Sequence, residues 1–192
     1  FAGVAQDEIV DPRPYCEVLR QWSTFHPEFA FLPRKFKIAV SGTLEDRAVT
    51  YAHDVGLQLY RDEKGEVLAR VIVGGGMGRT PILGSVIQEA LPWQHLPTYL
   101  DAVLRVYNRY GRRDNAYKAR IKILVKAIGA EAFARQVDEE WKLERDGIAT
   151  VTQAELDRAS AAFTDPDAPE RPATDAGFDA KRASDPAFAR WV

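Results

Sequence analysis

The chain has 192 residues, 46% of them hydrophobic, which is enough for one domain with a sizeable core but tight for two complete domains. Its formal net charge of -2 gives the whole molecule no pull on nucleic acid or on anionic membranes, so any such attraction must come from local clusters. The single cysteine, Cys16, excludes an internal disulfide framework and any cysteine-based metal or cluster site built from this chain alone, and favours a reducing, cytoplasmic setting. No apolar run approaches the roughly 18 residues that span a bilayer, so no membrane partner is expected.

The first 30 residues are predicted to form an irregular arm and one short helix. Glycine and proline interrupt residues 1–14, and the apolar residues after them have helical spacing up to Pro27. Cys16 lies on this helix near Leu19 and Trp22, so we expect a buried, inert thiol. Because the chain begins with Phe1 instead of Met, we also expect it to be a segment of a longer protein.

Three strands are predicted next. The residues KFKIAVSG, 35–42, alternate apolar and polar side chains as a half-buried strand does. Residues 55–73 read as a hairpin with its turn around Gly65. A basic cluster, Arg34, Lys35 and Lys37, precedes the first strand; it is either an anion site or a set of lysines that discourage edge pairing.

A glycine run, VIVGGGMGRTP at 71–81, follows the hairpin directly. It has neither the Walker spacing nor the G-x-G-x-x-G spacing, which weakens a nucleotide-binding hypothesis. The run offers bare backbone N–H groups and the guanidinium of Arg79, both suited to carboxylates or phosphates. A plain turn without a ligand is the alternative.

The remainder is predicted to be mainly helical, with no element assigned between the glycines and Pro97. Helices are expected within 98–111, 115–129, 130–144 and 152–163, the last beginning with a Thr152–Glu155 capping box. From Thr164 onward the chain is rich in Pro, Asp and Ala, which indicates a linker or docking tail.

Residues 105–126 carry eight cations against the lone acid Asp114. The stretch is either a solvated helix face or an anion-binding segment, and the second case includes a module that binds RNA or another polyanion. The histidines, His26, His53 and His95, share no ligand spacing and are expected to be structural or on the surface.

Three segments together, FLPRKFKIAVSG, VIVGGGMGRTP and NRYGRRDNAYKARIKILVKAIG, resemble the siroheme-binding half of the nitrite and sulfite reductase family. The resemblance covers about residues 1–141. It implies an α+β fold, a mixed sheet flanked by helices. It also implies siroheme bridged to a 4Fe-4S cluster, the six-electron reduction of sulfite to sulfide or of nitrite to ammonia, and a ferredoxin or flavoprotein as electron donor.

The resemblance also assigns residues. Arg34, Arg120 and Lys122 would contact the substrate on the distal side of the siroheme. The cofactor would be lined by these residues: Arg34, Lys35, Lys37, Gly74, Gly75, Gly76, Met77, Gly78, Arg79 and Thr80. An ideal helix separates positions 120 and 122 by about 200°, so both reach one ligand only if the helix starts near them or is irregular. Lys122 would be the better proton source, because the pKa of arginine lies above about 12.

The cysteines that hold the cluster in this family have no counterpart here, so the resemblance implies a fragment that is inactive alone. The expected organisation is an N-terminal arm and helix at 1–30, a siroheme-binding α+β domain at 31–145, and at 146–192 a helical extension and tail leading toward a missing second half. No nucleic-acid partner is expected on this interpretation.

Overall fold

A computed structural model of the chain describes residues 1–164 and 174–192. A four-stranded sheet of order β1-β2-β3-β4 forms its centre. The strands are β1 (Ile38–Ser41), β2 (Val55–Arg61), β3 (Val67–Val73) and β4 (Ser85–Pro92). β1 runs parallel to β2 and the other pairs are antiparallel, so the expected mixed sheet is confirmed.

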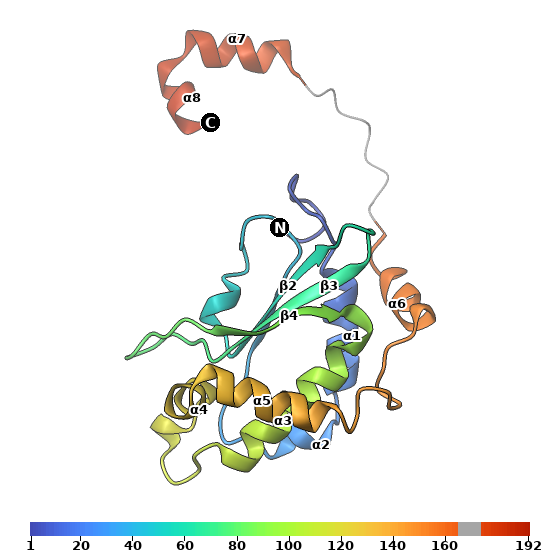
Figure 1. Ribbon diagram of the computed structural model, residues 1–192. Helices are drawn as coiled ribbons and strands as arrows, with labels where there is room; N and C mark the ends of the chain where they lie inside the picture. The colour runs from blue at the N-terminus through green and yellow to red at the C-terminus, as the bar shows by residue number, and fades with distance from the viewer. Residues whose placement is uncertain (165–173) are drawn as a thin grey trace.

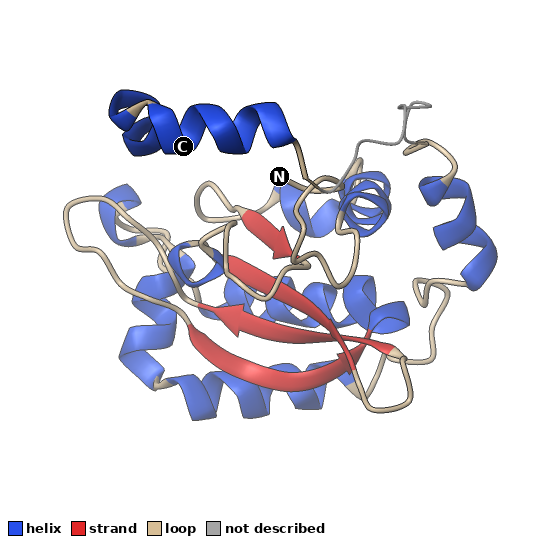
Figure 2. Cartoon of the chain, turned by 90° about the horizontal axis from the view of Figure 1, so that it is seen from above, coloured by secondary structure: helices blue, strands red, loops and turns tan. Residues whose placement is uncertain are grey.

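Helices cover one face of this sheet (Figure 1). The longer helices on that face are α3 (Leu96–Tyr110), α4 (Ile121–Ile128) and α5 (Ala130–Trp141). α5 packs on β4 and α4 contacts β3, and Figure 2 looks onto the sheet with helices behind it. The other helices before residue 164 are α1 (Arg13–Ser23), α2 (Pro27–Ala30) and α6 (Gln153–Ser160), and the single-turn helices are η1 (Thr50–Ala52), η2 (Trp93–His95) and η3 (Ala116–Lys118). The predicted α+β class is therefore correct.

The core follows from the alternation in β2 and β3. Leu57, Leu59 and Val71 are fully or almost fully buried against the helical layer, whereas Gln58 and Arg70 alternate with them and lie on the other face, where they hydrogen-bond to each other. Side chains of successive strand residues point to opposite faces, so one hydrophobic face per strand is sufficient to hold the helices.

The strand β4 was not predicted. Its pairing with β3 shifts register twice, between Ala69 and Val71 and between Val71 and Ile72. Such irregularities insert residues into one strand and interrupt the period-two pattern on which strand prediction depends. β4 is also an edge strand with exposed residues on both faces, such as Glu89 and Ala90.

The expectation of a buried Cys16 is wrong. Cys16 is exposed, because α1 turns Pro14, Tyr15 and Leu19 toward the interior instead. The helix expected within 115–129 is confirmed as α4, which begins only at Ile121, with η3 and an extended Arg120 before it.

The predicted tail contains two short helices, α7 (Ala176–Ser184) and α8 (Pro186–Trp191). Each begins at an aspartate, Asp175 or Asp185, whose carboxylate accepts hydrogen bonds from the first turn. Residues 165–173, within the expected linker, lie outside the described residues. No helix in the described ranges is long and apolar enough to cross a membrane.

Candidate anion-binding site

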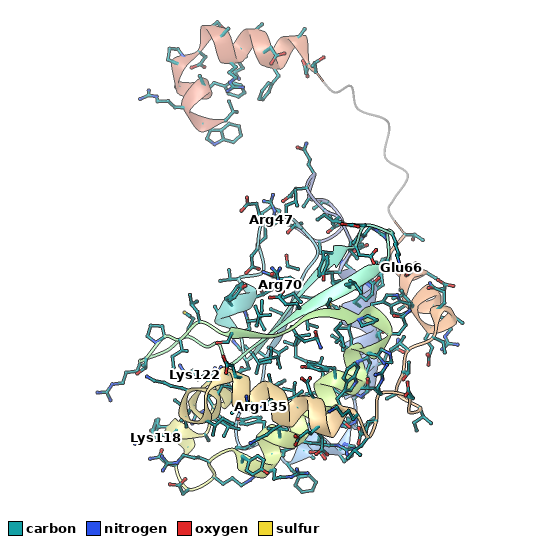
Figure 3. The ribbon with its side chains drawn as sticks, in the orientation of Figure 1. Arg47, Glu66, Arg70, Lys118, Lys122 and Arg135 are labelled. Atoms are coloured by element: carbon teal, nitrogen blue, oxygen red, sulfur yellow. The ribbon has the colours of Figure 1, made fainter. Side chains whose placement is uncertain are left out.

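One end of the sheet gathers the sequence segments that were singled out as motifs. Ile38, Val55, Val73 and Ser85 align as neighbours across the four strands. The basic cluster therefore ends where β1 starts, and the glycine run starts where β3 ends. Lys122 of α4 lies at this end, opposite the turn that carries Glu66 (Figure 3).

A buried ion pair joins these segments. Asp54, directly before β2, is fully buried, and its Oδ1 accepts a hydrogen bond from Arg120 Nε at 2.8 Å and forms an ion pair with Arg120 Nη2 at 2.6 Å. Its Oδ2 accepts the backbone N–H of Lys37 at 3.1 Å, and its backbone carbonyl accepts the N–H of Gly74 at 3.0 Å. Burial raises the pKa of Asp54, and the Arg120 guanidinium opposes that rise. Asp54 thus fixes the start of β1, the glycine run and the residue before α4 in one place.

The ammonium of Lys122 is held by the glycine loop, residues 74–81. Its Nζ donates to the carbonyls of Thr80 at 2.7 Å and Gly76 at 3.1 Å, and lies 3.4 Å from that of Met77. Lys122 is only 7% exposed. Burial lowers its pKa and the nearby Arg120 charge lowers it further, while Asp54 opposes them. Unlike Arg120, Lys122 has neutral oxygens as its direct partners, so its charge is not cancelled by contact with a carboxylate.

Arg120 and Lys122 converge on Gly76. The helix begins between them, because Arg120 is the extended N-cap residue and α4 starts at Ile121. A Cβ on Gly76 would lie 3.0 Å from Lys122 Cδ and 3.1 Å from Arg120 Nη2. The missing side chain lets both cations pack closely against the loop. The helix starts between positions 120 and 122, and this start lets both side chains reach one place.

The glycines of the run serve different purposes. Gly74, at φ +88°, has the Cβ of Val125 2.9 Å from the position of its own missing Cβ. At Gly75 the same position is 2.2 Å from the carbonyl oxygen of Tyr51. Both residues are glycine because the chain packs against itself. At Gly76 the same position is crowded by Lys122 and Arg120. Gly78, at φ +117°, has no atom within 4 Å of that position, so of these four glycines only Gly78 leaves room for a ligand.

The other predicted residues surround this centre more loosely. Arg34 donates to the carbonyl of Ala116 and its guanidinium lies 5.8 Å from the ring centre of Tyr117, which ties it to the segment that precedes Arg120. Lys35 and the side chain of Lys37 are exposed at the start of β1. Arg79 is exposed in the loop between β3 and β4 that extends beyond the helices (Figure 1). No hydrogen bond or ion pair among the described residues joins Arg34 to Arg79.

The basic stretch 105–126 does not act as one cationic surface. We use the name Arg105 cluster for Arg105 and the carboxylates around it: Glu28, Asp101, Glu140 and Glu144. Arg109 pairs with Glu140, and Arg112 with Asp114. The cations of α3 and the loop after it are largely neutralised, so the polyanion-binding alternative gains no support.

One carboxyl group of the Arg105 cluster, that of Glu144, has an unusually high pKa. Burial, with the neighbouring Asp101 and Glu140 carboxylates, raises the pKa of Glu144 to about 7. The single guanidinium is divided among four acids and cannot neutralise all of them. His26, 3.6 Å from Asp101, adds little charge because burial lowers its pKa.

The chemistry of this site suits anions. Within residues 1–164 and 174–192, no group of three or more His, Cys, Asp or Glu side chains has metal-binding geometry. Arg120 and Lys122 provide charge, and the exposed backbone of Gly78 provides close access, for an oxyanion or carboxylate.

Sequence analysis missed Asp54. The residue precedes a predicted strand, but an aspartate there also reads as an ordinary turn residue. Its role becomes visible only when Arg120, 66 positions later, is placed against it.

Comparisons with known proteins identify the family that this chain resembles. The family described as nitrite and sulphite reductase 4Fe-4S domain matches residues 1–145. A protein named sulfite reductase [ferredoxin] 1 from Mycolicibacterium paratuberculosis is 37% identical over 142 residues, which cover 73% of this chain and 25% of that protein. A chloroplastic ferredoxin–nitrite reductase from Arabidopsis thaliana is 28% identical over 82% of this chain and 28% of its own length. The solved structure of the NirA protein of Mycobacterium tuberculosis superimposes with a TM-score of 0.64 at 29% identity, over 74% of this chain and 26% of that one. The chain thus spans about a quarter of the length of these relatives.

Proposed function

The chain belongs to the nitrite and sulphite reductase family, and we propose that it forms the cationic wall that holds siroheme and the anionic substrate, sulfite or nitrite, within a longer reductase. The observation that carries this proposal is the convergence of Arg120 and Lys122 on Gly76, with the ammonium of Lys122 held, among the described residues, by carbonyl oxygens alone. A carboxylate-bearing tetrapyrrole and a small oxyanion both need concentrated positive charge and close backbone approach.

The three proposed substrate residues have different tasks. Lys122 keeps its charge free of any direct carboxylate contact, and its lowered pKa makes it the group best able to give up a proton. Arg120 remains protonated and offers a fixed fork of donors. Arg34 comes from the segment before β1 and adjoins the 116–117 segment, where it would extend the cationic wall.

The residues present fit siroheme but not the iron-sulfur cluster. Exposed backbone at Gly78, together with the exposed cations Lys35, Lys37 and Arg79, suits the rim of an acidic macrocycle. The cluster would need thiolates, and the one thiol, Cys16, is exposed on α1, outside this site. In the assembled enzyme the cofactors would supply the electrons for reduction, with cluster ligands from a second half. A ferredoxin or a flavoprotein would deliver electrons to the assembled enzyme. The expected location of this enzyme is the cytoplasm.

The test is to add siroheme to the purified chain and to follow its visible absorption band by titration. Lys122→Met and Gly76→Ala are expected to weaken binding about tenfold or more, which corresponds to about 1.4 kcal/mol. The first removes the charge and the second fills the space between the cations. Lys64→Met is the matched control, because Lys64 is exposed in the turn at the opposite end of the sheet.

Two results would overturn the proposal. One is a chain that binds no siroheme, or binds it equally well in all these variants. The other concerns activity: we expect no reduction of sulfite or nitrite by the isolated chain, and turnover there would contradict the assignment of the cluster to a second half.

A further inference from the structure

Asp54 has no role in the proposed function as stated above, yet it occupies the centre of the site. It is fully buried, and both the hydrogen bond from Arg120 Nε and the ion-pair contact of Nη2 end on its Oδ1. A buried carboxylate is costly unless it is paired and hydrogen-bonded, so its presence here requires an explanation.

The pair orients the guanidinium of Arg120. The contacts at Asp54 engage Nε and Nη2 at distances of 2.8 and 2.6 Å. Contacts through Nε and Nη2 to one carboxylate oxygen hold that edge of the guanidinium against Asp54. Nη1 is left out of this pair, and Nη2 lies 3.1 Å from the position that a Cβ on Gly76 would take.

Two other contacts keep Asp54 itself in place. Its Oδ2 accepts the N–H of Lys37, and its backbone carbonyl accepts the N–H of Gly74. The carboxylate is thus connected to β1 and to the glycine loop, which are the two walls that the ligand would meet. A mutation here is transmitted to Arg120 directly and to the loop through the main chain.

We propose that Asp54 is a positioning residue that orients Arg120 toward the anion bound at this end of the sheet. This inference rests on the proposed function for the identity of the anion. The Asp54–Arg120 contact also has a consequence that does not depend on siroheme.

The first experiment uses the chain without cofactor and measures hydrogen exchange at arginine Nε–H groups by ¹⁵N NMR. Arg120 Nε–H is expected to exchange at least about tenfold more slowly than that of Arg112, since Arg112 makes a similar pair with Asp114 but is exposed. This comparison needs no variant. Equal exchange rates would overturn the inference.

The second experiment is a double-mutant cycle on siroheme affinity with Asp54→Asn and Arg120→Gln. Asp54→Asn should weaken binding about tenfold in the native background and have little effect when Arg120 is already changed. A purely structural loss would weaken both backgrounds alike and would overturn the inference. Asp46→Asn is the control: Asp46 caps the N–H of Thr50 on the same segment, so it should lower stability and leave affinity unchanged.

The two experiments distinguish a failure of the proposed function from a failure of the inference about Asp54. A native chain that binds no siroheme would overturn the proposed function, and the exchange comparison would still decide whether Asp54 holds Arg120. Slow exchange that persists in Asp54→Asn would overturn the inference even if siroheme binds.

Discussion

Replacing Gly74 with alanine tests whether the glycine run is shaped by the protein's own packing. Gly74 has φ +88°, and its missing Cβ would lie 2.9 Å from the Cβ of Val125 on α4. The matched control is Gly65→Ala in the β2–β3 turn, where φ is +84° and no atom lies within 4 Å of the Cβ position. The two glycines share a backbone conformation and differ in their surroundings.

The expected magnitudes follow from that difference. An alanine in left-handed conformation costs roughly 1–2 kcal/mol at either position. Overpacking against Val125 adds about 1–3 kcal/mol at position 74 only. Gly74→Ala should therefore lower the free energy of unfolding by about 2–5 kcal/mol, and Gly65→Ala by about 1–2 kcal/mol.

Urea unfolding followed by circular dichroism measures both values. Combining Gly74→Ala with Val125→Ala should restore part of the loss, because the added methyl group then enters the space vacated by the valine. Equal losses at positions 65 and 74, or no coupling to Val125, would refute the packing explanation for this glycine.

Three further outcomes are expected from the same unfolding assay. Between about pH 4.5 and 7 the folded chain retains the proton on Glu144 while the unfolded chain releases it. The free energy of unfolding should therefore fall as pH rises, by at most about 3 kcal/mol. Glu144→Gln should make this pH dependence weaker, and an unchanged pH dependence would contradict the raised pKa. Tyr107→Phe should cost about 1–2 kcal/mol, because the phenol donates at 2.6 Å to the buried carbonyl of Ala119, next to Arg120; a loss near zero would show that this bond contributes nothing. Thr152→Ala removes the α6 capping box and should cost about 1 kcal/mol, whereas retained stability would indicate that the cap is dispensable.

Local patterns in the sequence determined much of the fold. Alternation along β2 and β3 and the turn at Gly65 specified the hairpin, and the Thr152–Glu155 spacing specified the start of α6. These features depend on residues that are close together in the chain, so the spacing of residues in the sequence is enough to predict them. β4 was missed because the register shifts in its pairing with β3 interrupt the alternation of apolar and polar residues.

The site depended on contacts between distant residues. The sequence identified cations and glycines as an anion site, but it could not say which glycines serve packing. Val125 and Tyr51 decide that for Gly74 and Gly75, and neither is near them in sequence.

What the sequence determined alone was the inventory: a hairpin that ends in glycines, cationic segments before β1 and around α4, and too few cysteines for a cluster. Only the tertiary structure decided that Arg120 pairs with Asp54 and that Lys122 donates hydrogen bonds to carbonyls of the glycine loop. The physical reason is that the groups in contact with a cation determine how much of its charge is neutralised. The direct partner of Arg120 is the buried carboxylate of Asp54, while those of Lys122 are neutral carbonyls. Two cations that lie two positions apart in the sequence therefore have different partners and different surroundings in the fold.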